Sequence, residues 1–131
     1  MLAPMARLTI RVDLGKEAAF GPGKARLLEE ISDKGSIRAA AAAMKMSYRR
    51  AWLLVQDIET IMGAPVVAAE TGGVRGGGAK LTALGSDVVK RYRAIETRAS
   101  RAVAAELSAM EKIARGSSAP VQRIVRRARR N

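Results

Sequence analysis

The sequence predicts a mainly α fold with one small β-hairpin, and three features of the chain indicate this. Hydrophobic residues make up 48% of the sequence but aromatic residues only 3%, which favours helices packed through small side chains. Apolar residues recur at helical spacing in most segments. A glycine-rich stretch lies between two short β-prone runs. At 131 residues the chain is long enough for one core of modest size.

The first elements that we expect are a strand and a helix. Residues 7–14 alternate apolar and polar side chains, which is typical of a half-buried strand. Glycines and a proline then interrupt the chain. Residues 24–34 carry Ala25, Leu28 and Ile31 at helical spacing, and a helix over this range would end at the glycine that follows it.

Two serines mark the starts of the next two helices. Ser36 can accept a hydrogen bond from the first free N–H groups of a helix over 37–44, whose five consecutive alanines allow close approach by a neighbouring helix. After a turn at residues 45–46, Ser47 can begin a third helix that ends at Gly63. The core-facing residues expected on this third helix are Ala51, Leu54 or Val55, Ile58 and Met62.

The hairpin and a long last helix complete the fold. Residues 66–70 and 79–81 are short β-prone runs around a segment with five glycines, and we call this hairpin the wing. Thr82 can cap a helix over about 83–114, with apolar residues at near-heptad spacing. Because an exposed stripe of this length is an aggregation hazard, we expect it to pair with a second copy. The residues assigned to this dimerisation seam are Val88, Tyr92, Ile95, Ala99, Val103, Leu107 and Met110.

Charge and residue content restrict the function. Lysine and arginine number 24 against 12 acidic residues, and the net charge of +12 favours a polyanionic partner. The chain has no cysteine and no histidine, which removes thiol chemistry, the usual zinc ligands and the usual general base. We therefore expect no enzyme activity, no cofactor and no metal site. No window approaches the roughly 20 apolar residues of a membrane span, so we expect a cytoplasmic protein without a membrane partner.

The order of elements predicts a winged helix-turn-helix that binds double-stranded DNA. A capped helix, a turn and a second capped helix are followed by a wing, and the second helix would enter the major groove. Ser47 and Tyr48 can donate to phosphates, while Arg49 and Arg50 can reach guanine edges or phosphates. Ser36 is assigned to the same surface. The alternative is a solvated basic turn on an ordinary helix.

Other candidate contacts lie further along the chain. Gln56 shares a helical face with Arg49 and could read an adenine edge. Arg75 in the glycine-rich tip and Lys80 at its base are candidate minor-groove or phosphate contacts, unless the wing is only a solvated hairpin. Trp52 is expected to pack in the core or between helices rather than to stack on a base, since duplex DNA offers no free base face. A nucleotide-binding phosphate loop is excluded because the lysine is not followed by serine or threonine.

Three regions are expected. Residues 1–87 would form the DNA-binding domain, residues 82–115 the dimerisation helix, and residues 116–131 a basic, disordered tail. Residues 115–131 hold six arginines and no acid. The tail would add sequence-independent affinity through counterion release, or would serve only as a solubilising extension.

Three strings in the sequence resemble a known family. Gly-Ser-Ile at residues 35–37, Ser-Tyr-Arg-Arg-Ala-Trp at residues 47–52 and the string at residues 71–85 resemble the N-terminal DNA-binding domain of ModE-type molybdate-responsive transcriptional regulators. The resemblance covers about residues 7–115. Gly-Ser-Ile and Leu-Thr-x-x-Gly also occur in the related LysR-type regulators.

The resemblance implies a winged helix-turn-helix that dimerises through its terminal helix and regulates genes for molybdate uptake or molybdenum enzymes. By position, residues 47–50 become the head of the recognition helix and Arg75 the wing contact. Full-length members continue into a domain that binds the oxyanion, whereas this sequence continues into an arginine-rich segment. Molybdate binding by this chain is therefore not expected.

The leading hypothesis is a homodimeric, sequence-specific regulator that binds double-stranded DNA. The alternative is an architectural protein that coats DNA through charge with little sequence preference. An RNA-binding accessory protein is less favoured, because the aromatic side chains that stack on single-stranded bases are nearly absent.

Overall fold

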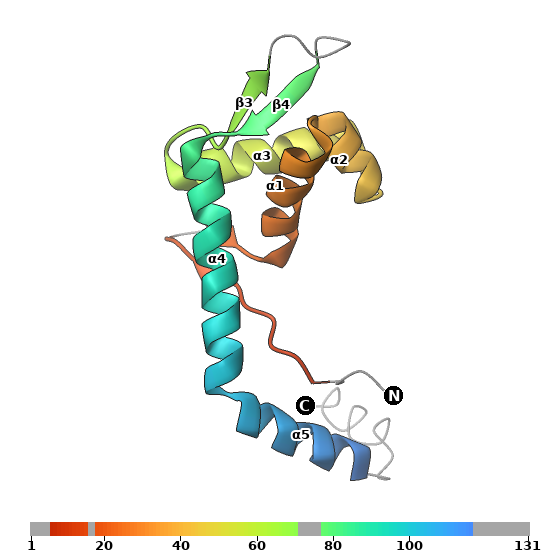
Figure 1. Cartoon of the computed structure of the whole chain (residues 1–131), viewed down its shortest axis with the longest axis vertical. Helices are drawn as coiled ribbons and strands as arrows, with labels where there is room; N and C mark the ends of the chain where they lie inside the picture. Colours follow the sequence, from red (N-terminus) through yellow and green to blue (C-terminus); the bar gives the residue numbers. More distant parts are fainter. Residues whose placement is uncertain (1–5, 16–17, 71–76, 117–131) are drawn as a thin grey trace, which may run out of the picture. The chain divides into compact units, whose positions relative to one another are not determined.

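The computed structural model describes residues 6–15, 18–70 and 77–116, and these form two units that are treated separately. Residues 9–98 make up the larger unit, and the described parts of residues 1–8 and 99–131 make up the smaller one. Within the described ranges, no helix combines the length and apolar character needed to span a bilayer. The elements, drawn in Figure 1, are β1 (Val12–Asp13), β2 (Ala19–Phe20), α1 (Pro22–Lys34), α2 (Ile37–Ala43), α3 (Tyr48–Met62), β3 (Val67–Glu70), β4 (Gly78–Leu81), α4 (Ala83–Ala102) and α5 (Ala104–Gly116).

Side-chain caps begin three of the helices, as the sequence predicted. The hydroxyl oxygens of Ser36, Ser47 and Thr82 each accept a hydrogen bond from the backbone N–H three residues on, at 3.0, 3.1 and 3.1 Å. Gly35 and Gly63 end α1 and α3 with φ angles of +79° and +75°, which glycine adopts without strain. α1 begins earlier than expected, because proline at the first helical position has no N–H to lose.

The core of the larger unit forms around α1, with α2, α3 and β4 packed against it. Leu27, Leu28 and Ile31 of α1 have no exposed surface. The neighbouring helices contribute three alanines, as the composition predicted: Ala40 and Ala41 of α2 and Ala51 of α3 are buried, together with the larger Val55 and Ile58 of α3. Of the two alternatives for the α3 stripe, Val55 is the buried one. Leu54 and Met62 are half-buried at its edge.

The first strand is much shorter than residues 7–14, so that expectation was wrong. Only Val12 and Asp13 pair, with Phe20 and Ala19 respectively, and the described residues before them form no strand. A strand needs a partner for its backbone groups, and here a side chain takes that place. The Tyr92 hydroxyl of α4 donates a hydrogen bond to the Ile10 carbonyl at 2.7 Å.

The wing is anchored to α3 and α4 at its base. β3 and β4 pair antiparallel from Val67 opposite Leu81 to Glu70 opposite Gly78. The Glu59 carboxylate of α3 accepts hydrogen bonds from the N–H groups of Val66 and Val67, at 2.9 and 3.3 Å. Figure 1 shows the hairpin standing beside α3. These bonds fix where the wing starts relative to the exposed face of α3.

α4 begins in direct contact with the backbone before the wing. The Thr82 N–H donates to the Val66 carbonyl at 3.0 Å, and the Thr82 hydroxyl donates to the Pro65 carbonyl at 2.8 Å. A Cβ on Gly85 would lie 2.2 Å from the Val66 oxygen, so only glycine fits there. Further along α4, Arg93 bridges Glu29 of α1 and Glu96, at 2.7 and 2.6 Å. The hydrogen bonds to these two carboxylates raise the pKa of the Arg93 guanidinium.

The segment expected as one helix over 83–114 consists of two helices, because α4 ends at Ala102 and α5 begins at Ala104. Val103 between them still donates to the Ala99 carbonyl at 3.1 Å and accepts from the Leu107 N–H at 2.9 Å. The sequence gives no sign of this division. Alanine surrounds the break, and alanine is the strongest helix former. No residue of α5 is buried.

Candidate DNA-binding surface

One face of α3 is exposed while the opposite face forms the core. Tyr48, Trp52 and Leu53 expose 42%, 43% and 48% of their surface, although all three carry large apolar groups. On the opposite face of the helix, Ala51, Val55 and Ile58 are buried. The predicted contacts Arg49, Arg50 and Gln56 all lie on the exposed side. Contact of these residues with DNA stays a prediction, but the structure leaves them accessible.

The cations around the start of α3 are not neutralised. Among the described residues, no ion pair involves Arg38, Arg49, Arg50 or Lys80. The acid nearest to Arg49 and Arg50 along α3 is Asp57, which pairs with Lys24 of α1 at 3.3 Å. The positive end of the α3 dipole adds to this charge. A region with this excess of positive charge suits a polyanion.

The two capping serines keep one hydrogen-bonding group free for a ligand. Their oxygens accept the capping N–H groups, and each hydroxyl proton can still be donated. Ser47 is exposed and Ser36 is half-buried. The predicted role of both as phosphate donors is therefore compatible with their role as caps.

A groove of about 370 Å³ runs between α3 and the wing. Tyr48, Trp52 and Gln56 line it from α3, and Gly77 to Ala79 line it from the wing side. Trp52 was expected to pack between helices, and this was wrong. It follows the buried Ala51 directly, and one residue along a helix turns the side chain by roughly 100°, away from the core.

Arg38 of α2 also lines this groove, and sequence reasoning missed it. Its guanidinium carbon lies 4.5 Å from the ring centroid of Tyr48, which is a cation–π distance. The available signal was that Arg38 follows the capping Ser36 by two residues, in the first turn of α2. Nothing in the sequence spacing indicated that it would reach the Tyr48 ring.

The predicted wing contacts differ in what the structure describes. Lys80 is exposed on β4, opposite Ala68 of β3. Arg75 lies outside the described residues, as do residues 117–131 of the expected tail. The wing is therefore described at its base, where Lys80 is the exposed cation on β4.

The residues of the predicted dimerisation seam have different environments. Tyr92 is 2% exposed and packs edge-on against Phe20, with ring centroids 5.3 Å apart. Its burial and the nearby Glu96 carboxylate raise the pKa of the Tyr92 hydroxyl. Tyr92 thus belongs to the core of its own chain. The heptad spacing had placed it in the dimerisation seam, and that assignment was wrong. Ile95, by contrast, is 42% exposed.

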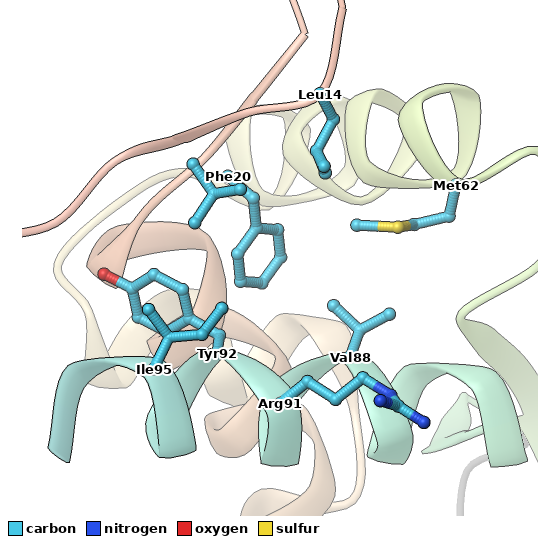
Figure 2. A pocket seen from close by; sticks show the side chains of 8 residues that line it. Leu14, Phe20, Met62, Val88, Arg91, Tyr92 and Ile95 are labelled. Carbon is cyan, nitrogen blue, oxygen red and sulfur yellow. The ribbon is translucent and has the colours of Figure 1, made fainter. Parts of the chain in front are cut away.

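An apolar cleft of about 240 Å³ opens beside Tyr92 on the larger unit (Figure 2). Leu14, Phe20 and Met62 approach it from one side, and Val88 and Ile95 of α4 lie across from them. Leu14 exposes 48% of its surface. On the smaller unit, Ala99, Val103 and Leu107 are half-buried, while Met110 and Ile113 expose 66% and 71%.

Comparisons with known proteins agree with this architecture. Residues 23–86 match the bacterial regulatory helix-turn-helix proteins of the LysR family. The solved complex of the CbnR DNA-binding domain with DNA superposes with a TM-score of 0.53 at 20% identity, covering 67% of this chain and 95% of that one. This likeness shows that the fold is that of a winged-helix domain.

Three relatives have a higher sequence identity to this chain than the CbnR domain has. The molybdenum transport protein ModE of Azotobacter vinelandii is 37% identical over 92 residues, which are 70% of this chain and 33% of that protein. The molybdenum-pterin-binding protein MopB of Rhodobacter capsulatus is 43% identical over 95 residues, covering 72% and 34%. The transcriptional regulator ModE of Haemophilus influenzae is 33% identical over 89 residues, covering 68% and 35%. The chain spans about a third of the length of these relatives. Residues 23–86 therefore match the LysR-family helix-turn-helix, and the chain that contains them is similar to the ModE-type regulators over about a third of the length of those proteins.

Proposed function

We propose that this chain is a sequence-specific transcriptional regulator that binds double-stranded DNA through the exposed face of α3. The observation that carries the proposal is the start of α3. Tyr48, Arg49 and Arg50 are exposed there and the two arginines have no ion-pair partner among the described residues, while the next turn is anchored in the core through Ala51. A helix held on one side, with cations at its exposed start, suits insertion into the major groove.

The individual contacts follow from side-chain chemistry. Arg49 and Arg50 would read guanine edges or bind phosphates, and Gln56, one to two turns later on the same exposed side, would read an adenine. Phosphate contacts would come from the hydroxyls of Ser36, Ser47 and Tyr48. Lys80 at the base of the wing, and Arg75 outside the described residues, would bind phosphate or minor groove.

The proposed assembly is a homodimer formed through α4 and α5. Two features support it: the apolar cleft beside the exposed Ile95, and the complete lack of buried residues on α5 despite its apolar side chains. Met110 and Ile113 of α5 expose 66% and 71% of their surface, and a second copy of the chain would cover these apolar side chains. A two-fold dimer would bind half-sites about one helical turn apart, on the order of 34 Å.

The relatives suggest which genes are regulated. Because the matched proteins carry names of molybdenum transport and transcriptional regulation, we include control of genes for molybdate uptake or molybdenum enzymes in the cytoplasm. Molybdate binding is no part of the proposal.

A competition gel shift on the best site selected from random duplexes tests the proposal. Arg49→Ala and Arg50→Ala should each lower the preference for that site over random duplex by about tenfold, the value of one good base contact. Arg98→Ala, which removes an exposed arginine of α4, is the control and should leave the preference unchanged. A wild-type preference near unity would refute sequence-specific regulation and would support the architectural alternative.

A further inference from the structure

We propose that the groove between α3 and the wing holds one sugar–phosphate strand of the bound duplex, with Arg38 as its phosphate contact and Trp52 as its apolar contact. This rests on the proposed function and extends it. Neither residue belonged to the contacts predicted from the sequence. The proposal adds a second row of contacts, on the wing side of α3, to the row formed by Arg49 and Arg50.

Arg38 is held in place by a ring and not by a carboxylate. Its guanidinium lies over Tyr48 at 4.5 Å, and no acidic side chain within the described ranges pairs with it. A stacked guanidinium has its face covered but keeps the N–H groups at its edge, which suit bidentate binding of a phosphate. Because the ring restricts its motion, Arg38 would lose less conformational entropy on binding than a free side chain.

The acid that lines this groove is already engaged. Glu59 is the carboxylate among the described lining residues, and it accepts the two backbone N–H groups of Val66 and Val67. Two donors at 2.9 and 3.3 Å stabilise this carboxylate and hold it at the base of the wing. Arg38 is the other charged group that lines the groove, and its N–H groups can bind an anion.

Trp52 gives the groove an apolar surface, which would contact a sugar or a methyl group of DNA and not a phosphate. With 43% of its surface exposed between Tyr48 and Gln56, it offers a flat apolar contact for a deoxyribose or a thymine methyl group. On the other wall, Gly77 and Gly78 present no side chains. A strand of duplex DNA carries a phosphate and a sugar in alternation, which matches an arginine from α2 and a tryptophan from α3 in the same groove.

The first experiment removes the arginine. Arg38→Ala should weaken binding by the same factor on the selected site and on random duplex, because a phosphate contact carries no sequence information. The slope of log affinity against log salt should fall in magnitude by about 0.9, the value for one phosphate. Arg98→Ala is the matched control for a change in net charge. An unchanged slope in Arg38→Ala, or a loss confined to the selected site, would overturn the assignment of Arg38.

A double-mutant cycle tests whether Tyr48 positions Arg38. Tyr48→Phe keeps the ring, so Arg38→Ala should cost the same in that background as in the wild type. Tyr48→Leu removes the ring, and the cost of Arg38→Ala should then shrink by about two- to fivefold. Equal costs in all three backgrounds would show that the stack plays no part in the contact.

Trp52 can be followed directly because it is the only tryptophan of the chain. On a saturating duplex, its accessibility to acrylamide should fall by about half as the exposed ring is covered. Anisotropy of a labelled duplex in the same sample separates the outcomes. If the duplex binds and Trp52 stays as accessible as before, the groove assignment is wrong while the proposed function stands. If no duplex binds at all, the proposed function and this inference both fail.

Discussion

Gly85→Ala should destabilise the larger unit, because the added methyl group would clash with the backbone of Val66. The new Cβ would lie 2.2 Å from the Val66 oxygen and 3.1 Å from the Val66 carbonyl carbon. That oxygen also accepts the Thr82 N–H at 3.0 Å, so moving it away weakens a hydrogen bond at the start of α4. The clash therefore acts where α4 meets the base of the wing.

The magnitude follows from three contributions. Overpacking costs about 1–3 kcal/mol. Weakening the Thr82 hydrogen bond costs up to about 1 kcal/mol. Alanine in place of glycine inside a helix returns about 1 kcal/mol. The net expectation is a loss of about 0–3 kcal/mol in the free energy of unfolding, and the contact with backbone atoms places the expected value toward the upper end of that range.

Equilibrium unfolding in urea, followed by circular dichroism and Trp52 fluorescence, measures this loss. Gly23→Ala is the matched control: it lies in the first turn of α1, and its added Cβ would meet no atom within 4 Å. It should leave stability unchanged or raise it by up to about 1 kcal/mol. If Gly85→Ala behaves like Gly23→Ala, the packing argument for this glycine is refuted.

Three further predictions concern a cap, a buried hydroxyl and the dimer. Ser47→Ala should lower the free energy of unfolding in urea by about 1 kcal/mol. Ser47→Asn should keep the wild-type stability, since asparagine also caps helices. Equal stability of the two variants would contradict the cap. Folding raises the pKa of the Tyr92 hydroxyl above its ordinary value of 10.0. The neutral hydroxyl therefore contributes fully to the free energy of unfolding below pH 10.0, and this contribution is lost as the pH rises above that value. Tyr92→Phe should cost about 1–2 kcal/mol at neutral pH and should flatten the alkaline loss of stability. Ile95→Lys should shift the proposed dimer toward monomer in analytical sedimentation, whereas Thr97→Lys on the same helix should not. An unchanged dimer dissociation constant in Ile95→Lys would show that this face of α4 is not in the interface.

The parts of the fold that the sequence predicted are those set by neighbouring residues. A serine or threonine whose hydroxyl meets the free N–H three residues later caps a helix through local contacts alone, and Ser36, Ser47 and Thr82 all do so. Glycine at a left-handed position likewise ends a helix locally. Such features need no knowledge of the tertiary structure, so the spans of α2 and α3 agreed with expectation to within about one residue at each end.

The parts that were missed depend on contacts between distant residues. The strand over residues 7–14 alternates correctly, but Tyr92 takes the Ile10 carbonyl that a strand partner would have used. The same contact moves Tyr92 from the heptad seam into the core, beside Phe20. An apolar stripe indicates only which face of a helix is buried. It does not say whether the same chain or a second copy covers it.

The candidate site shows how the least distinctive part of the sequence determines its geometry. Five alanines in a row suggest no chemistry, yet Ala40 and Ala41 pack in the same core as Ala51 of α3. Small side chains at a helix contact allow the two helix axes to approach closely, and α2 and α3 meet through such residues. That approach brings Arg38 over the Tyr48 ring and leaves Trp52 facing the groove. Larger residues at these alanine positions would separate α2 from α3, so the alanines act on DNA binding through the position of Arg38 while touching no DNA themselves.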